Sequence, residues 1–346
     1  MRWRRRLAAA TLLAGVLFGS AALVGCANLS HWSQAVSGHL GVLRAARPVD
    51  EVLADPATPA LLAERLRLTQ QMRRFATERL ALPDNSSYTR YADLGRNAAV
   101  WNAVAAPEFG FTLKTWCYPL MGCAGYRGYF DLPAARAEVE ALRLAGWDAQ
   151  VIPVPAYSTL GWSGWLGGDP LLNTFVQREE GELAAQLFHE LAHQKVYVAD
   201  DTGFNEAYAS AVELLGARQW LAAKPEALAA FEAGRAQRES FLTQARALRD
   251  RLGALYALDL PLAEKRARKQ ALLRSAQAPS GYERWFAAAN NANLALLGAY
   301  EDLVPGFVRL FERCGGDWLR FHAAVAALAP LSPVERRARL ASDAGP

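Results

Sequence analysis

The segment LFHELAH, residues 187–193, contains two histidines four positions apart, with a glutamate directly after the first. No proline or glycine interrupts residues 182–198, which favours a continuous helix. Residues four apart on a helix project from the same face, so His189 and His193 could bind one metal ion. This spacing predicts a site for one zinc ion with Glu190 beside it as a general base. The alternative is a pair of histidines buried in the core.

A third protein ligand is expected from FNE, residues 204–206. Asn205 is a typical cap residue, so Glu206 would lie in the first turn of a second helix that crosses the first. Two histidines and a carboxylate would leave the fourth position of a tetrahedral zinc ion for water. Glu213 and Asp201 are the alternative third ligands, and Glu213 could instead hydrogen-bond a ligating histidine.

The N-terminus has the pattern of a targeting segment. Residues 1–6 contain four arginines, and an apolar run over residues 7–24 follows them. The run leads into Cys26 in the sequence LVGC, which resembles a bacterial lipobox. We therefore predict a signal peptide over residues 1–25 and a lipid anchor on Cys26; a membrane-spanning signal anchor is the alternative. Ala27 after the cysteine favours the periplasmic face of the outer membrane.

The remainder of the chain is electrically balanced. The formal net charge of the whole sequence is +4, and the four arginines near the N-terminus account for all of it. Hydrophobic residues make up 52% and charged residues 21%, which is typical of a globular protein. The charge pattern gives no indication of nucleic-acid binding.

The cysteines after residue 26 divide into a pair and a single residue. Cys117 and Cys123 are six positions apart, and export to an oxidising compartment would allow them to form a disulfide. Two buried thiols are the alternative. Cys314 has no neighbour in sequence and is expected to be a buried, unpaired thiol.

Hydrophobic periodicity predicts an α+β fold. Apolar residues at helical spacing predict helices over residues 31–47 and 60–82. Between residues 98 and 155, short aromatic or β-branched runs surround a helix predicted at 133–145 and indicate three or four strands of a small mixed sheet. These runs are AAVWNAVAA, FGFTLKTW, YRGYF and QVIPV. From residue 178 onward, almost every segment is predicted to be helical.

These patterns divide the chain into four regions. They are a signal peptide (residues 1–25), an N-terminal helical region (26–97), a catalytic core with the sheet and the HExxH helix (98–223), and a helical C-terminal region (224–346). Residues 156–173 are rich in Gly, Trp and Ser, which is typical of a binding loop. Tyr157, Ser158 and Thr159 are candidate substrate contacts, because an extended peptide could add to the sheet edge there.

The HExxH helix followed by Asn-Glu resembles the gluzincin metallopeptidases. Several further stretches are similar to a family of bacterial lipoproteins described as predicted aminopeptidases: ALPDNSSYTRYADL, WCYPLMGCAGYRGYF, AYSTLGW, LFHELAHQKVYVADDTGFNEAYASAVE and WFAAANNANLALLGAYEDLVPGF. The resemblance implies a zincin-like fold and zinc-dependent hydrolysis of peptides at the cell envelope. The gap of 12 residues before the third ligand is shorter than is usual in gluzincins.

The predicted reaction is metal-assisted amide hydrolysis. Glu190 would take a proton from the zinc-bound water and pass it to the leaving amine. Tyr300 is the first candidate donor to the oxyanion and Tyr157 the second, with buried packing as the alternative for either. The sequence lacks the G-A-M-E-N loop of the large zinc aminopeptidases. An envelope endopeptidase and a non-catalytic, zinc-containing peptide-binding lipoprotein are therefore the alternatives to an aminopeptidase.

Overall fold

The computed structural model describes residues 31, 33–118, 122–156, 168–199, 201–297 and 303–341. The predicted lipidation site, substrate contacts and first oxyanion donor lie outside these residues: Cys26, Tyr157, Ser158, Thr159 and Tyr300. Among the described helices, none combines the length and the apolar character needed to cross a membrane.

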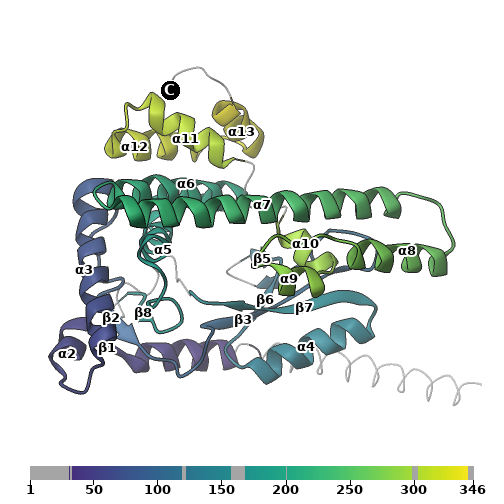
Figure 1. Cartoon of the computed structure of the whole chain (residues 1–346), viewed down its shortest axis with the longest axis horizontal. Helices are drawn as coiled ribbons and strands as arrows, with labels where there is room; N and C mark the ends of the chain where they lie inside the picture. Colours follow the sequence, from purple (N-terminus) through teal and green to yellow (C-terminus); the bar gives the residue numbers. More distant parts are fainter. Residues whose placement is uncertain are drawn as a thin grey trace, which may run out of the picture.

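Two long helices run across the upper part of the molecule in Figure 1. One group of helices lies above them, and the other elements lie below. The two long helices are α6 (Thr202–Leu221) and α7 (Pro225–Tyr256), and α7 extends from the helical half to the half that contains the larger sheet. Helix α5 (Glu180–His193) lies below α6, and α3 (Ala60–Leu80) stands at the left edge. A further helix over residues 33–45 lies along the bottom.

The packing of α5 against α6 is the most extensive between two helices in the described part of the chain. Leu187 and Phe188 of α5 are completely buried, as are the alanines at positions 207, 209 and 211 of α6. Small side chains on α6 permit this close approach. A Cβ atom at Gly216 would come within 2.8 Å of Leu80 Cδ1 and 2.9 Å of Phe188 Cδ2, so it would not fit unless these buried side chains moved.

The larger sheet has the strand order β6–β3–β7, and both pairs are antiparallel. Strand β7 (Trp147–Val154) pairs with β3 (Val100–Pro107) along its whole length, whereas β6 (Arg127–Tyr129) pairs with only three residues of β3. Helix α4 (Leu132–Leu144) packs on this sheet around a core that includes Trp101. The Asp131 side chain caps α4 by accepting a hydrogen bond from the backbone N–H of Ala134.

Two smaller sheets complete the strand content of the described residues. Strand β2 (Arg90–Ala92) pairs antiparallel with β1 (Ala46–Pro48) and parallel with β8 (Leu171–Leu172). The hairpin of β4 (Trp116–Tyr118) and β5 (Gly122–Ala124) places two cysteines directly opposite each other. A disulfide joins them, Cys117 to Cys123, while Cys314 is buried and free.

The remaining helices form two groups. The first packs around the second half of α7 and includes α8 (Leu262–Arg274), α9 (Glu283–Ala287) and α10 (Asn291–Leu297). A buried network ties this group to the sheet: Lys269 Nζ lies 2.7 Å from Asp148 Oδ2, which also accepts the backbone N–H of Asn291. The second group, above α6 in Figure 1, comprises α11 (Val304–Arg313), α12 (Trp318–Leu328) and α13 (Pro333–Ala341).

The observed mixture of helices and small sheets agrees with the predicted α+β class. The strand predicted for FGFTLKTW is wrong, because residues 111–115 have no regular structure and only Trp116 enters a strand. Phe109 and Phe111 instead pack on the Tyr256 ring of α7. One core cluster contains residues from each predicted region of the mature chain, as Leu66, Leu187 and Phe307 illustrate.

His322 has a structural role in the described part of the chain. Its Nε2 atom donates to the carbonyl oxygen of Leu80 at 2.8 Å, which leaves Nδ1 to accept the Tyr208 hydroxyl at 2.8 Å. Burial lowers the pKa of His322 to about 4, so its ring is neutral near pH 7. These bonds join α12, α3 and α6.

The start of α6 is held by a buried ion pair with the C-terminal helix. Arg336 of α13 contacts Asp201 Oδ2 with Nε at 2.9 Å and Nη2 at 2.8 Å, and both side chains are almost fully buried. Arg336 Nη1 donates to the carbonyls of Ala329 and Leu331, and the guanidinium lies over the Phe204 ring. The pair is therefore fully satisfied by hydrogen bonds, as a buried ion pair must be.

Replacing Arg336 with Met should lower the free energy of unfolding by about 3–5 kcal/mol, because Asp201 would remain as an unpaired buried charge. Chemical denaturation of the two proteins measures this difference. The matched control is Arg337→Met at the exposed neighbouring position, which should change the stability by less than about 0.5 kcal/mol. Equal losses in the two variants would contradict a stabilising role for the pair.

Candidate metal centre

Helix α5 buries most of its side chains but leaves one stripe open. Between Leu183 and Ala192, the residues that are not buried are Gln186, His189 and Glu190. These positions are three or four apart, or adjacent, and therefore share one face of the helix. The rest of α5 packs against α3, α6 and α7. The first histidine of the motif thus lies on the open face rather than within the apolar core.

The first turn of α6 is fixed by side chains on both sides of Glu206. Asp201 caps the helix, since its Oδ1 atom accepts the backbone N–H of Phe204 at 3.2 Å. The Asn205 amide bonds both the N–H and the C=O of Val198, at 2.8 Å and 2.7 Å. These bonds fix the loop between the two helices. Asp201, an alternative ligand in the sequence, is used as a cap and ion-pair partner instead.

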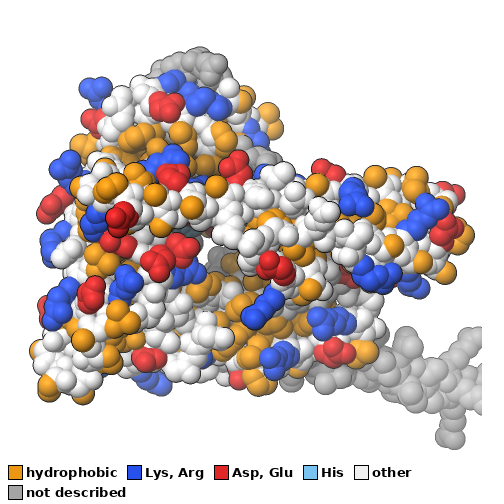
Figure 2. Space-filling view, in the orientation of Figure 1, with side chains coloured by type: hydrophobic (Ala, Val, Ile, Leu, Met, Phe, Trp, Pro, Cys, Tyr) orange, Lys and Arg blue, Asp and Glu red, His pale blue; other side chains and the backbone are white. Residues whose placement is uncertain are grey.

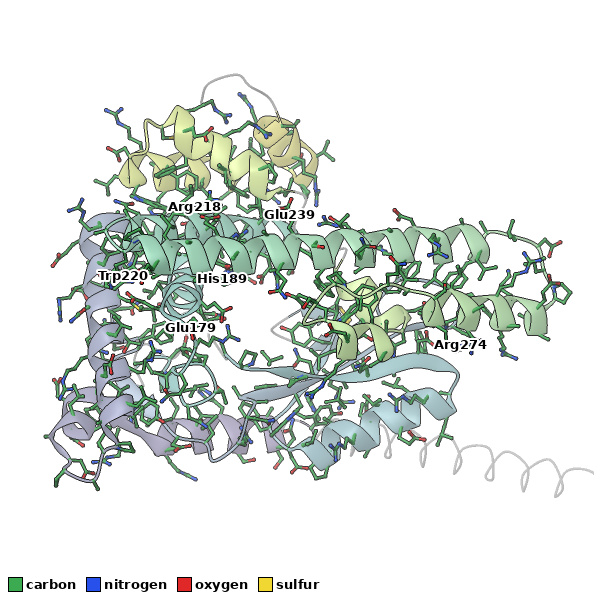
Figure 3. All side chains as sticks on the ribbon, viewed as in Figure 1. Glu179, His189, Arg218, Trp220, Glu239 and Arg274 are labelled. Atoms are coloured by element: carbon green, nitrogen blue, oxygen red, sulfur yellow. A yellow bond between two sulfur atoms is a disulfide. The ribbon has the colours of Figure 1, made fainter. Side chains whose placement is uncertain are left out.

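Three side chains from the two helices converge on one point. The Nε2 atoms of His189 and His193 are 3.1 Å apart. Glu206 Oε2 lies 3.4 Å from Nε2 of His189, and Glu206 Oε1 lies 3.7 Å from Nε2 of His193. Among the described residues, this is the one group of three side chains placed to hold a metal ion. Figure 3 shows His189 on α5, beneath the long α7 helix.

The separations between these atoms fit a tetrahedral ion. With ligand bonds of about 2.0–2.1 Å, tetrahedral zinc holds its ligand atoms about 3.3 Å apart. The three measured separations, 3.1, 3.4 and 3.7 Å, lie around this value. His189, His193 and Glu206 could therefore bind a metal ion, and three protein ligands leave a coordination position for a small molecule.

Electrostatics around the histidines also favour a cation. Burial alone would lower the pKa of His189, but hydrogen bonds with Glu206 and Glu213 raise it well above its usual value. Burial would raise the pKa of Glu206, yet its bonds with the two histidines lower it to about 2. The site thus gathers the carboxylates of Glu206 and Glu213 around His189, with Arg235 on the outer side of Glu213. A divalent cation would replace the protons that these groups attract.

Glu213 contacts the far side of the His189 ring. Its Oε2 atom lies 3.0 Å from His189 Nδ1, and its Oε1 atom lies 3.6 Å from Arg235 Nη1 on α7. A carboxylate at Nδ1 keeps the ring proton there, so Nε2 is left as the ligand atom. Glu213 is therefore an orienting group, one of its two predicted roles. His193 Nδ1 makes no hydrogen bond with the described residues.

Glu190 is fixed by a hydrogen bond within its own helix. The Gln186 amide Nε2 donates to Glu190 Oε1 at 2.7 Å, and Arg178 Nη1 donates to Gln186 Oε1 at 3.3 Å. Burial raises the pKa of Glu190, while the two histidines lower it. The sequence prediction omitted Gln186, although its position four residues before Glu190 is a usable signal.

Tyr126 is a second residue that the sequence prediction omitted. It lies in the turn between β5 and β6, directly after the disulfide hairpin, and 41% of it is exposed. Partial burial of the hydroxyl, the charge of Glu206 and the nearby Tyr197 raise the pKa of Tyr126 above its usual value. The phenol thus lies within electrostatic range of a candidate metal ligand. The stretch YRGYF, which begins with Tyr126, does not indicate that Tyr126 lies near Glu206, because the proximity arises from tertiary packing.

Glu108, Glu180 and Asn291 have structural partners. Arg266 donates two hydrogen bonds to the Glu108 carboxylate, from Nε to Oε1 at 2.6 Å and from Nη2 to Oε2 at 2.9 Å. Glu180 accepts the Trp220 indole N–H at 2.7 Å and pairs with Lys224. Asn291 is buried and bonds the carbonyls of Pro107 and Glu108, so it supports the sheet.

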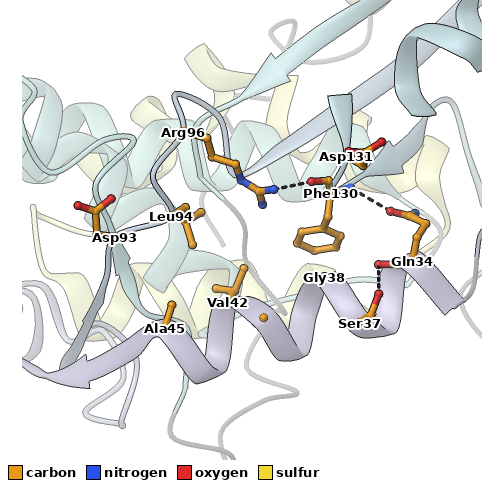
Figure 4. A pocket seen from close by; sticks show the side chains of 11 residues that line it. Gln34, Ser37, Gly38, Val42, Ala45, Asp93, Leu94, Arg96, Phe130 and Asp131 are labelled. Atoms are coloured by element: carbon orange, nitrogen blue, oxygen red, sulfur yellow. Dashed lines mark hydrogen bonds between the residues drawn. The ribbon is translucent and has the colours of Figure 1, made fainter. Parts of the chain in front are cut away.

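A pocket of about 400 Å³ lies elsewhere, between the helix over residues 33–45 and the segment before α4 (Figure 4). Phe130 projects into it, with Arg96 and Gln34 bonded to the Phe130 backbone. None of its lining residues belongs to the group of metal ligands. On the face shown in Figure 2, basic and acidic side chains are interspersed.

Glu213→Gln should weaken zinc binding by about 10–100-fold, because the His189 ring would lose a charged hydrogen-bond partner. Competition with a chromophoric chelator measures the dissociation constant. Glu239→Gln, at an exposed position of α7, is the matched control and should leave that constant unchanged. Equal affinity in the Glu213 variant and the wild type would show that Glu213 does not support the ligand.

Comparison with known proteins gives one family. Residues 30–340 match the model of a family described as "Putative aminopeptidase". The match begins just before the first described helix and extends through most of α13, so it includes the candidate metal ligands and their supporting elements. No curated protein and no solved structure matches the chain. Since the match covers most of its length, the chain belongs to this aminopeptidase family.

Proposed function

We propose that this protein is a zinc-dependent aminopeptidase that hydrolyses peptide bonds at the bacterial cell envelope. The observation that carries the proposal is the convergence of His189, His193 and Glu206 beside the carboxylate of Glu190. Membership of the aminopeptidase family supports the peptidase activity. A structural metal site would have no need for a general base next to the ion.

Zinc is the proposed ion because of the ligand types. Imidazole nitrogen and carboxylate oxygen suit zinc, and two histidines with one glutamate form a common catalytic set. A purely structural zinc site is usually closed by four protein ligands. The described residues supply three. We also propose the zincin-like arrangement on this basis, with the motif on α5 and the third ligand on α6.

When bound, zinc supplies Lewis-acid chemistry: it makes a coordinated water more acidic and polarises the carbonyl group. Glu190 is the proposed general base, which removes a proton from the attacking water and delivers it to the leaving amine. Burial raises the pKa of Glu190 above its usual value, the direction that strengthens a carboxylate as a base. His189 and His193, on the same helix, keep a fixed relation to this base.

Tyr126 is the proposed donor to the oxyanion that forms during hydrolysis. Its hydroxyl lies within electrostatic range of Glu206, and its half-exposed position leaves it accessible to a substrate. A phenol can donate a hydrogen bond to a developing negative charge without itself ionising. Tyr300 and Tyr157 remain alternative donors. Tyr157, Ser158 and Thr159 also remain the proposed contacts to an extended peptide.

The proposed location is the periplasmic face of the outer membrane. The lipobox-like sequence before Cys26 supports a lipid anchor. The disulfide between Cys117 and Cys123 is the kind of bond that persists in an oxidising compartment, which supports export. Both features support the proposal that hydrolysis takes place outside the cytoplasm.

Glu190→Gln should keep stoichiometric zinc but lower the rate of peptide hydrolysis by about 10²–10⁴-fold, because the general base is removed. Hydrolysis of an aminoacyl fluorophore and metal analysis of the same protein measure the two quantities. His189→Ala is the companion variant and should lose zinc as well as activity. An unchanged rate in the Glu190 variant would exclude its proposed role.

The same assay decides between exopeptidase and endopeptidase activity. An aminopeptidase cleaves the aminoacyl fluorophore and spares an internal peptide whose N-terminus is acetylated. Preferential cleavage of the acetylated peptide would favour an envelope endopeptidase. Tight binding of peptides to the zinc-loaded protein, without cleavage of either substrate, would favour a peptide-binding lipoprotein.

Tyr126→Phe should lower kcat by about 100-fold, because one donor to the oxyanion is lost while the ring is kept. Steady-state kinetics with the aminoacyl fluorophore measure this loss. Tyr197→Phe is the control, since Tyr197 is also exposed and lies near Tyr126, and it should have a much smaller effect. Equal kcat values for the Tyr126 variant and the wild type would indicate that Tyr300 or Tyr157 is the oxyanion donor instead.

A further inference from the structure

Two consecutive hydrogen bonds link three residues at the open stripe of α5: Arg178, Gln186 and Glu190. The direction of each bond is fixed by chemistry. A guanidinium group can only donate, so the Gln186 amide must turn its oxygen toward Arg178, at 3.3 Å. Its nitrogen then faces Glu190 and donates to Oε1 at 2.7 Å. The amide of Gln186 therefore cannot reverse without breaking both bonds.

This arrangement has two consequences for Glu190. The carbonyl oxygen of a protonated carboxyl group accepts a hydrogen bond better than its hydroxyl oxygen does, so the Gln186 donor on Oε1 favours the proton on the other oxygen, Oε2. The bond also restrains the Glu190 side chain to one rotamer. A hydrogen bond to an ionised acceptor is stronger than a neutral one, and the Arg178 charge polarises the amide further.

The bond adds little to stability by itself. A pair of side chains four apart on a helix surface contributes about 0.2–0.5 kcal/mol. Gln186 is not buried, and the packing of α5 rests on the apolar residues at neighbouring positions such as Leu187. A structural account therefore predicts that loss of the amide would be almost silent.

We infer that Gln186 is the positioning residue of the general base Glu190, and that Arg178 holds the Gln186 amide in its working orientation. The inference rests on the proposed function of Glu190. Gln186 directs Oε2 of Glu190 toward the proton of the attacking water, and it makes Oε1 the poorer proton acceptor of the two oxygens. Because Gln186, Glu190 and the histidines lie on one helix, this geometry is set within a rigid element.

The kinetic test uses Gln186→Met, which keeps the length of the side chain but removes the donor. The expected result is a loss of about 10–100-fold in kcat, since a misdirected catalytic group loses rate rather than affinity. KM, zinc content and melting temperature should stay unchanged. Glu182→Gln, one turn earlier at an exposed position, is the matched control and should retain the wild-type kcat.

Arg178 provides a rescue test. Arg178→Met removes the charged donor to the Gln186 oxygen and should lower kcat in the same way, by a smaller factor. Arg178→Lys retains a charged donor and should recover most of the rate. If the Met and Lys variants were equally active, Arg178 would have no role in holding the Gln186 amide.

A binding measurement separates this inference from the proposed function. Acetohydroxamate binds zinc and can donate a hydrogen bond to a neighbouring carboxylate, so its dissociation constant reports the position of Glu190 without turnover. That constant should rise about 10-fold in zinc-loaded Gln186→Met. If the wild-type protein shows no peptidase activity, the proposed function is wrong, but the hydroxamate measurement still tests the position of Glu190. Unchanged kcat and hydroxamate affinity, or a loss that follows zinc loss or unfolding, would overturn the inference.

Discussion

The close packing of α5 on α6 is the constraint on which the rest of the structure depends. The two helices meet through buried aliphatic and aromatic side chains on one and small residues on the other, with Gly216 at a point where no Cβ would fit. Because their backbones approach closely, the side chains of His189 and Glu206 can meet across the interface. A wider separation would leave the histidines without a carboxylate. The apolar packing therefore determines the geometry of the polar site.

The polar site and the apolar core divide α5 between them. Its buried positions secure the helix and include His193, whereas its open stripe carries His189, a candidate metal ligand, and Glu190, the proposed base. Supporting contacts come from different directions: Glu213 orients His189 from α6, and Gln186 restrains Glu190 from the preceding turn. Each supporting group fixes the atom that must remain free, Nε2 in the first case and Oε2 in the second. In the proposed mechanism, activity depends on these two atoms remaining free.

The sequence predicted those features that depend on spacing within a helix or between consecutive helices. The pairing of His189 with His193 follows from a four-residue interval, and Glu206 follows from a short loop with a cap residue. Tyr126 could not be predicted, because a separate hairpin brings it near Glu206. The strand expected in FGFTLKTW failed for a similar reason: its phenylalanines pack on Tyr256, far along the chain, instead of pairing in a sheet. Long-range packing has no signature in a short window of sequence.

The ion pair between Asp201 and Arg336 joins residues 135 positions apart in the chain. A ribosome makes Asp201, Glu206 and both histidines long before it reaches Arg336. Until then, the carboxylate at the start of α6 has no arginine to neutralise it, although every metal ligand has already been synthesised. A chain that stops short of α13 would carry the complete motif but lack the group that secures the first turn of the ligand helix. The order of synthesis therefore makes the contact that secures the start of α6 one of the last in the protein to be completed.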